Sequence, residues 1–317
     1  MAIALAPRFP MIRLWVYEAD LAERMHSSRQ NDIYLPGCEL PPQVVPVHDL
    51  AAALDGAEIV LSVMPSHLVR GLYQHMLPFL RESMLFVSAT KGLENDTLLR
   101  MSEVIAQVLR SRFAARIAVI SGPTFAREVA RFEPTALVVA SDDLGLAETV
   151  QQAFSGPTFR LYASSDTTGV EVGGSIKNVV AIGAGVLHGM GMGHNVMAAL
   201  ITRGLAEMTR LAVAMGGRGQ TLAGLAGLGD LVLTCTGDLS RNRAVGVELA
   251  RGRKLDEIVG SMKMVAEGIK TTNAAVDLAR RLWVEMPIAH QMFQMLHFGV
   301  SPRDAIQRLM ERSLKGE

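Results

Sequence analysis

The sequence predicts an α/β domain with a parallel sheet, followed by a domain built only from helices. Short apolar runs alternate with helical segments through the first half of the chain, and strand-like runs stop at Ser164-Ser165-Asp166. The length of 317 residues is enough for two domains. We therefore expect a ligand-binding α/β domain over residues 1–163 and an all-helical domain over residues 164–317.

Composition narrows the functional classes. Hydrophobic residues make up 49% of the chain and charged residues 20%, which predicts a large core rather than disorder. The formal net charge is 0, so we expect no nucleic-acid partner. Cys38 and Cys235 cannot form a disulfide framework and lack metal-ligand spacing, so we expect no metal and a cytoplasmic location. The opening residues do not resemble a signal peptide.

The most apolar long segment is residues 179–201. It contains His188, His194, Asn195 and several glycines, and is expected to be a buried helix rather than a membrane span.

The first half alternates strands with helices. Strands are expected at residues 12–17, 58–64, 85–89, 117–120, 135–140 and 159–162, and helices at residues 19–27, 49–54 and 94–111. Apolar strands that alternate with helices favour a parallel sheet covered on both faces. Ligands of such sheets bind beyond the carboxyl ends of the strands. This rule selects Glu18, Pro65-Ser66, Thr90-Lys91-Gly92 and Gly122-Pro123-Thr124, although each can also be an ordinary strand end.

The second half is expected to be helical at residues 170–188, 195–216, 241–251, 271–282, 288–298 and 302–313. Lys177 lies near the start of the first of these helices, with Gly173 and Gly174 three and four residues before it. Each glycine inside a helix costs about 1 kcal/mol relative to alanine, and close approach of a ligand to the backbone would explain the pair. Burial lowers a lysine pKa, so Lys177 could exchange protons near neutral pH. The alternative is a snorkelling lysine beside glycines that only permit helix packing.

Two further stretches carry polar groups among apolar residues. Asp230 is a carboxylate in an apolar environment and needs a cationic partner such as Lys177, unless it only caps a helix. Ser240-Arg241-Asn242-Arg243 reads as a helix N-terminus, and these residue types could also hold a phosphate. Val265-Ala266-Glu267-Gly268 precedes another helix and by itself is only a cap.

Seven motifs in order identify a resemblance to the bacterial NAD(P)-dependent glycerol-3-phosphate dehydrogenases. They are Tyr34-Leu35-Pro36-Gly37, Ala89-Thr90-Lys91-Gly92-Leu93-Glu94, Ser121-Gly122-Pro123-Thr124-Phe125-Ala126, Glu171-Val172-Gly173-Gly174-Ser175-Ile176-Lys177-Asn178-Val179, Gly229-Asp230-Leu231-Val232-Leu233-Thr234-Cys235-Thr236-Gly237, Ser240-Arg241-Asn242-Arg243 and Val265-Ala266-Glu267-Gly268. The resemblance implies a Rossmann-type domain, an all-α domain of the 6-phosphogluconate dehydrogenase-like kind, and an active site between them.

The resemblance also implies the reaction and the roles of residues. Hydride would pass reversibly between NAD or NADP and the glycerol 3-phosphate/dihydroxyacetone phosphate pair, supplying glycerol 3-phosphate for phospholipid synthesis. Lys177 matches the proton acceptor. The substrate contacts match Lys91, Gly122, Thr124, Lys177, Asp230, Ser240, Arg241 and Asn242, and the cofactor contacts match Tyr17, Tyr34, Lys91, Ala126, Arg241, Val265 and Glu267. Lys91 should lower the pKa of Lys177 further, and Asp230 should oppose that shift if it lies close.

The sequence departs from this family in two places. A Rossmann-type domain opens with a strand and a Gly-x-Gly-x-x-Gly turn, but residues 1–6 look like the helix that should follow them. Roughly fifteen residues are missing by motif spacing, which we expect to reflect a start site placed too late; a chain this short should bind cofactor poorly and be less stable. Glu18 follows Tyr17 where many relatives carry arginine. A carboxylate there favours NADH over NADPH, because it accepts hydrogen bonds from a ribose diol and repels a 2′-phosphate.

Two other functions stay open at this point. A related dehydrogenase could act on another hydroxy acid or phosphate with the same two-domain plan. A non-catalytic relative could keep the substrate domain and lack the pyrophosphate-binding turn. A homodimer is possible.

Overall fold

The computed structural model describes residues 1–262 and 264–314. Contacts between Cα atoms divide the chain into two compact units. We call Met1–Met64, Leu68–Thr90 and Ser102–Thr167 the sheet unit, and Pro65–His67, Lys91–Met101 and the chain from Thr168 onward the helical unit. Two short segments from the first half of the sequence therefore belong to the helical unit.

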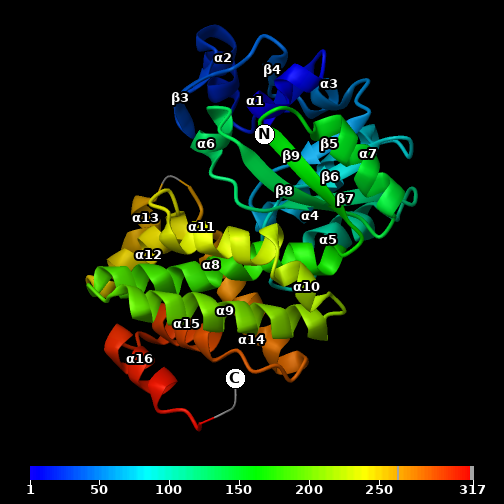
Figure 1. Cartoon of the computed structure of the whole chain (residues 1–317). Helices are drawn as coiled ribbons and strands as arrows, with labels where there is room; N and C mark the ends of the chain where they lie inside the picture. The colour runs from blue at the N-terminus through cyan, green and yellow to red at the C-terminus, as the bar shows by residue number, and fades with distance from the viewer. Residues whose placement is uncertain (263, 315–317) are drawn as a thin grey trace. The chain divides into compact units, whose positions relative to one another are not determined.

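The sheet unit alternates strands and helices (Figure 1). Its strands are β1 (Ile12–Trp15), β2 (Gln30–Asn31), β3 (Leu35–Glu39), β4 (Val44–Val47), β5 (Ile59–Ser62), β6 (Leu85–Ser88), β7 (Arg116–Ser121), β8 (Thr135–Ala140) and β9 (Phe159–Ser164). Its α-helices are α1 (Ala2–Leu5), α2 (Ala19–Ser28), α3 (Leu50–Leu54), α4 (Val69–Met76), α5 (Met101–Leu109), α6 (Ala126–Ala130) and α7 (Leu144–Phe154). Short 3₁₀ turns lie at Ala6–Arg8, Ser66–Leu68 and Leu77–Phe79.

The main sheet has the strand order β5-β6-β7-β8-β9, while β1 pairs with β4 and β2 with β3. The pairs β1–β4, β5–β6, β6–β7 and β8–β9 are parallel, as expected, but β7 and β8 are antiparallel. The connection between β7 and β8 carries only the five-residue α6, which rises about 7.5 Å and cannot return the chain along the sheet. The α/β fold class is confirmed, with this one strand reversed.

One expected helix of the first half is wrong in part. Residues 94–111 were expected to be helical, but the helix begins at Met101. The preceding residues form a tight turn in which Leu98 has φ 61°, and Leu93 makes a bridge to Arg100. This turn lies in the helical unit, where Leu93 enters the hydrophobic core. Tertiary packing therefore overrides the helical pattern of these residues. The expected strands are present, whereas β2, β3 and β4 were missed.

The helical unit contains no strands among its described residues, as predicted. Its helices are α8 (Thr167–Gly189), α9 (His194–Ala214), α10 (Gly219–Leu222), α11 (Asp230–Thr236), α12 (Arg241–Ala250), α13 (Leu255–Ser261), α14 (Glu267–Arg281), α15 (Pro287–Phe298) and α16 (Pro302–Met310). A single π-helical turn, Leu225–Gly229, precedes α11.

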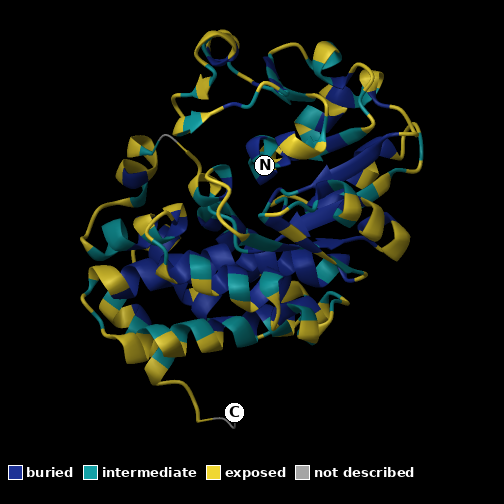
Figure 2. Cartoon of the chain, turned by 45° about the horizontal axis from the view of Figure 1, so that its top comes forward, coloured by how far each residue is buried: buried dark blue, intermediate teal, exposed yellow. Residues whose placement is uncertain are grey.

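Helix α8 is the centre of the helical unit. Its side chains supply much of the core, including Val172, Ile176, Val179 and Ile182. Figure 2 shows buried residues concentrated along this helix and in the strands of the main sheet. Helix α8 is long and apolar enough to cross a membrane, but its apolar 18-residue window is wholly buried in the protein, which is typical of a core helix. The expectation of a buried helix over residues 179–201 is thus met only as far as residue 187, because the chain turns at residues 190–193 and residues 188–201 are exposed or half-buried.

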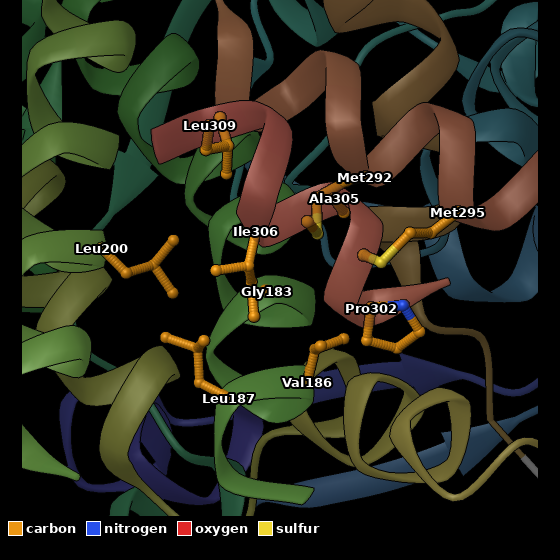
Figure 3. A pocket seen from close by; sticks show the side chains of 10 residues that line it. All are labelled: Gly183, Val186, Leu187, Leu200, Met292, Met295, Pro302, Ala305, Ile306 and Leu309. Atoms are coloured by element: carbon orange, nitrogen blue, oxygen red, sulfur yellow. The ribbon is translucent and has the colours of Figure 1, made fainter. Parts of the chain in front are cut away.

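The packing of the helical unit leaves a small apolar cavity of about 30 Å³ (Figure 3). Its walls come from α8, α9, α15 and α16, with Gly183, Leu200, Met292 and Ile306 among the lining residues. Gly183 contributes no side chain to this space.

Candidate active site

Three charged residues meet in the helical unit. Lys177 of α8 donates a hydrogen bond to Oδ1 of Asp230, at the start of α11, and Lys91 Nζ lies 2.7 Å from Oδ2 of the same carboxylate. The Asp230 side chain has no exposed surface, Lys177 is 6% exposed and Lys91 is 21% exposed. Thr234 completes the cluster, because its Oγ1 accepts a hydrogen bond of 2.8 Å from Lys177. One carboxylate thus joins two lysines, of which Lys91 is the more accessible.

Burial sets the protonation behaviour of Lys177. The pKa of Lys177 is lowered from 10.5 to about 7 in total. Removal from water is the largest cause, Asp230 acts in the opposite direction, and the positive charge of Lys91 also lowers the pKa. All three directions agree with the sequence-based expectation. Lys177 is therefore an amine that gains and loses a proton near neutral pH, in contact with a fixed carboxylate and hydroxyl.

The segment that carries Lys91 is attached to α8. The amide of Gly92 donates a 3.0 Å hydrogen bond to Oγ of Ser175, and Arg100 forms a 2.8 Å ion pair with Glu171 one turn earlier. Gly92 has φ 140°, and a Cβ there would collide with Ser66 at 2.6 Å. Only glycine fits this backbone beside Lys91, so the loop is held by its conformation as well as by its contacts.

The position of Asp230 follows from the π-helical turn before it. Asp230 is the first residue of α11 and its side chain caps nothing; it binds the two lysines. The capping interpretation is therefore wrong, and the ion-pair alternative is correct. π-helical turns of this kind are frequent at functional sites. A Cβ at Gly173 would lie 2.5 Å from the carbonyl oxygen of Ala226 in this turn. Close approach of this backbone, rather than of a ligand, accounts for Gly173.

The predicted phosphate-binding residues begin α12. Ser240 is the N-cap as expected, accepting a 3.2 Å hydrogen bond from the amide of Arg243. Gly185 of α8 and Gly246 of α12 face each other so closely that a Cβ on Gly185 would overlap the carbonyl oxygen of Arg243. This contact fixes α12 against the helix that carries Lys177. Arg241, at the first position of α12, remains exposed.

Glu267 begins α14 and binds the segment Pro65–His67. Its carboxylate accepts a 3.1 Å hydrogen bond from the amide of Ser66 and a 2.7 Å hydrogen bond from the Ser66 hydroxyl. Gly92 lies against the same pair, since a Cβ there would also approach Oε2 of Glu267 to 3.1 Å. Val265, two residues earlier, is 37% exposed. The acidic turn is thus bound to the loops that follow β5 and β6.

In the sheet unit, the predicted cofactor residues cluster after β1. Tyr34 donates a 2.6 Å hydrogen bond to Oε1 of Glu18, and Tyr17 is 75% exposed with its ring 6.1 Å from that of Trp15. Burial and the Glu18 charge act with this hydrogen bond, the largest cause, to raise the pKa of Tyr34. An exposed aromatic ring and a carboxylate that accepts hydrogen bonds are groups that can bind a nucleoside.

The remaining predicted residues follow β7. Gly122 has φ 143°, and a Cβ there would lie 2.9 Å from Leu137, so a side chain would strain both backbone and packing. Thr124 donates a 3.1 Å hydrogen bond to the carbonyl oxygen of Gly122, and Ala126 starts α6. This turn therefore lies at the carboxyl end of a central strand, where the sheet rule placed it.

Sequence reasoning missed Thr234 and gave Ser66 only as part of a strand end. Thr234 lies four residues after Asp230 and hence on the same helix face, a spacing that could have revealed it. No local signal marks Ser66 as a partner of Glu267, because the two residues are 201 positions apart.

Comparison with known proteins decides the family. Models described as the N-terminus and the C-terminus of NAD-dependent glycerol-3-phosphate dehydrogenase match residues 1–147 and 166–307. A glycerol-3-phosphate dehydrogenase [NAD(P)+] of Koribacter versatilis is 58% identical over 302 residues, covering 95% of this chain and 90% of that protein. The chain belongs to the NAD-dependent glycerol-3-phosphate dehydrogenase family. The resemblance seen in the seven motifs is thereby confirmed.

Other members of the glycerol-3-phosphate dehydrogenase family agree over nearly the whole chain. The enzyme of Citrifermentans bemidjiense with the same name is 52% identical over 317 residues, covering 100% of this chain and 95% of that protein. The crystal structure of glycerol-3-phosphate dehydrogenase from Coxiella burnetii superposes with a TM-score of 0.93 at 39% identity, covering 98% of this chain and 94% of that one. A Rossmann-like domain and a helical domain are thus the common plan, and the family uses NAD or NADP.

Proposed function

We propose that this protein catalyses the NAD(P)H-dependent interconversion of dihydroxyacetone phosphate and sn-glycerol 3-phosphate. The names of its relatives support the reaction. The observation that carries the proposal for this chain is the buried Lys177, with its pKa lowered to about 7 beside Asp230 and Lys91.

Lys177 moves the proton of the reacting oxygen. In oxidation, the neutral amine accepts the hydroxyl proton of glycerol 3-phosphate as hydride leaves the carbon that carries that hydroxyl. In reduction, the ammonium returns that proton to the carbonyl oxygen. A nicotinamide cofactor, when bound, would supply the hydride acceptor or donor. Lys91 stabilises negative charge that develops on the oxygen, and Asp230 and Thr234 orient the amine.

The start of α12 holds the substrate phosphate. Ser240 and Arg241 supply a hydroxyl and a guanidinium at a helix N-terminus, which together suit a dianion. Asn242 is proposed as a further contact through the second N–H of Nδ2, because its first N–H is bonded to Asn178. Gly122 and Thr124 are proposed as further substrate contacts. Binding energy from the phosphate orients the carbonyl carbon for hydride transfer.

The residues of each unit fit a nicotinamide cofactor. Tyr17, Tyr34 and Ala126 are the proposed contacts from the sheet unit, and Lys91, Arg241, Val265 and Glu267 those from the helical unit. Oε2 of Glu18 can accept a hydrogen bond from a ribose hydroxyl, because the hydrogen bond from Tyr34 goes to Oε1. A carboxylate at this position supports a preference for NADH over NADPH.

We also propose a cellular location, a metabolic role and an oligomeric state. Cys38 and Cys235 are free thiols, which supports a reducing cytoplasm. The role in supplying glycerol 3-phosphate for phospholipids is proposed from the family. A homodimer is also proposed. Light scattering of the purified protein would give a single mass of two chains if this is correct, and one chain if it is not.

The function is tested by following NADH oxidation with dihydroxyacetone phosphate. Turnover with this substrate, and much slower turnover with phosphate-free hydroxy acids, supports the proposal. Faster turnover of another hydroxy acid or phosphate ester would favour the related dehydrogenase. Binding of glycerol 3-phosphate without turnover, in a folded protein, would favour the non-catalytic alternative.

A further inference from the structure

A chain of hydrogen bonds joins three helices of the helical unit that each carry a proposed site residue. The amide of Gly268 donates to Oδ1 of Asn242 at 2.9 Å, and Nδ2 of Asn242 donates to Oδ1 of Asn178 at 2.9 Å. Nδ2 of Asn178 in turn faces the carbonyl oxygen of Gly174 at 3.4 Å. This series of hydrogen bonds therefore begins at α14, passes through α12 and ends within α8.

The orientation of both side-chain amides is determined by this sequence of donors and acceptors. A backbone N–H can only donate, so the atom of Asn242 that faces Gly268 is its oxygen. The nitrogen of Asn242 must then face the oxygen of Asn178. Asn178 is 5% exposed and Asn242 is 8% exposed, so water does not compete for these bonds. Flipping either amide would place two donors or two acceptors together in a buried site, which is unfavourable.

Packing leaves no room for these hydrogen-bonded groups to move. A Cβ at Gly268 would lie 2.6 Å from the carbonyl oxygen of Asn178 and 2.9 Å from Oδ1 of Asn242. Glycine at this position lets α14 approach α8 and α12 to hydrogen-bonding distance. Gly185 and Gly246 bring α8 and α12 together further along. The three helices are thus in fixed register around Asn178.

Each residue in this series of hydrogen bonds directly follows a proposed site residue in the sequence. Asn178 follows Lys177, Asn242 follows Arg241, and Gly268 follows Glu267. We infer that Asn178 is a positioning residue: it fixes the phosphate-binding start of α12 relative to the amine of Lys177. The inference rests on the proposed function. Asn178 then acts through Asn242, so that phosphate binding places the carbonyl carbon within reach of Lys177.

The readout is the advantage that the phosphate gives to the substrate. We define it as kcat/KM for dihydroxyacetone phosphate divided by kcat/KM for dihydroxyacetone, both measured with NADH. Asn178→Leu keeps the number and branching of the side-chain heavy atoms and removes both hydrogen bonds of the side chain. A misplacement of about 1 Å can reduce the rate a hundredfold, so we expect Asn178→Leu to reduce the phosphate advantage roughly ten- to a hundredfold.

Two further variants separate positioning from general destabilisation. Gly268→Ala breaks the chain from α14 and should reduce the same ratio. Val180→Ala, in the core of α8 against Gly204, removes apolar volume without touching the chain and should lower the melting temperature while leaving the ratio unchanged. If Asn178→Leu does not fold, Gly268→Ala alone decides the matter.

The outcomes also separate this inference from the proposed function. If the unmodified protein shows no preference for dihydroxyacetone phosphate, the proposed function fails. A large preference in the unmodified protein that falls in Asn178→Leu and Gly268→Ala, but not in Val180→Ala, supports positioning. The same preference in all four proteins, or an equal loss in Val180→Ala, overturns the inference while the proposed function stands.

Discussion

Lys177 donates a hydrogen bond to Asp230, and the carboxylate that receives it has no exposed surface. A buried carboxylate is stable only when cations and donors surround it, which here are Lys177 and Lys91. The same burial that makes Asp230 dependent on the lysines lowers the pKa of Lys177 to about 7. One ion-pair cluster thus accounts for both the fold of this region and its proton chemistry.

Charge changes around Lys177 should move the pH profile in opposite directions. Asp230→Asn removes the charge that favours the ammonium, so the pKa of Lys177 should fall. Lys91→Met removes a neighbouring cation, so the pKa should rise. Glycerol 3-phosphate oxidation needs the neutral amine, and its rate should therefore level off at lower pH in Asp230→Asn and at higher pH in Lys91→Met. The pH dependence of kcat measures this, and unmoved profiles in both variants would contradict the electrostatic account.

Arg241 should be needed for binding the substrate phosphate. Arg241→Ala should raise the KM for dihydroxyacetone phosphate about ten- to a hundredfold, the loss of a hydrogen bond to a charged group. Arg241→Lys keeps the charge but loses the two-pronged geometry, and should give an intermediate KM. An unchanged KM in Arg241→Ala would exclude the start of α12 as the phosphate site. Arg253, an exposed arginine paired with Glu248 elsewhere in the helical unit, provides the control variant Arg253→Ala.

Two glycines of α8 should respond oppositely to alanine. In Gly183→Ala the new methyl group would enter the cavity of Figure 3, 3.4 Å from Sδ of Met292 and 3.5 Å from Leu200. Helix propensity alone then favours the variant by about 1 kcal/mol, so its Tm should rise. In Gly185→Ala the methyl group would overlap the backbone of α12, and the cost of overpacking is about 1–3 kcal/mol or more. A rise in Tm for both variants would show that α8 and α12 are not packed as described.

Glu207 should make stability depend on pH. Its side chain is 2% exposed and accepts hydrogen bonds of 2.7 and 3.1 Å from the amides of Ile288 and Ala289, at the start of α15. Burial raises its pKa from 4.5 to about 7, against the effect of those hydrogen bonds. The folded protein therefore holds a proton that the unfolded chain releases, and the resulting stabilisation is lost as pH rises from about 4.5 to 7.

The matched variant is Glu207→Gln, which keeps the volume and an acceptor but does not titrate. The unmodified protein should lose unfolding free energy on the order of 3 kcal/mol between those pH values, and Glu207→Gln should not show this loss. Denaturant unfolding at several pH values measures the difference between the two proteins. Parallel pH curves for Glu207→Gln and the unmodified protein would show that Glu207 titrates equally in both states.

The sequence was most informative where chemistry and local pattern coincide. Lys177 stood out because it is the one cation in an apolar glycine-containing helix start, and Asp230 because a carboxylate among apolar residues needs a partner. Their ion pair follows from those two facts. The N-cap at Ser240 follows from local helix rules alone.

Contacts between distant segments were not predictable in the same way. The turn before Met101 carries a helical pattern, yet Leu93, Gly92 and Arg100 are held by α8. The partnership of Ser66 with Glu267 likewise arises only when the chain folds. For Gly173 both a ligand and helix packing stayed open, because the sequence does not show which backbone approaches it, and in the structure that backbone is at Ala226. Tertiary packing decides each of these cases.

The most direct test of the account is kcat for glycerol 3-phosphate oxidation by NAD⁺ across the pH range, in the unmodified protein and in Lys177→Met. The account predicts that kcat of the unmodified protein rises with pH and levels off above about 7, since the neutral amine is the active form. It predicts for Lys177→Met a loss of about 10²–10⁴-fold with no titration near that pH. A Lys177→Met protein that keeps its rate, or that titrates as the unmodified protein does, would contradict the assignment of Lys177 as the proton-transfer group.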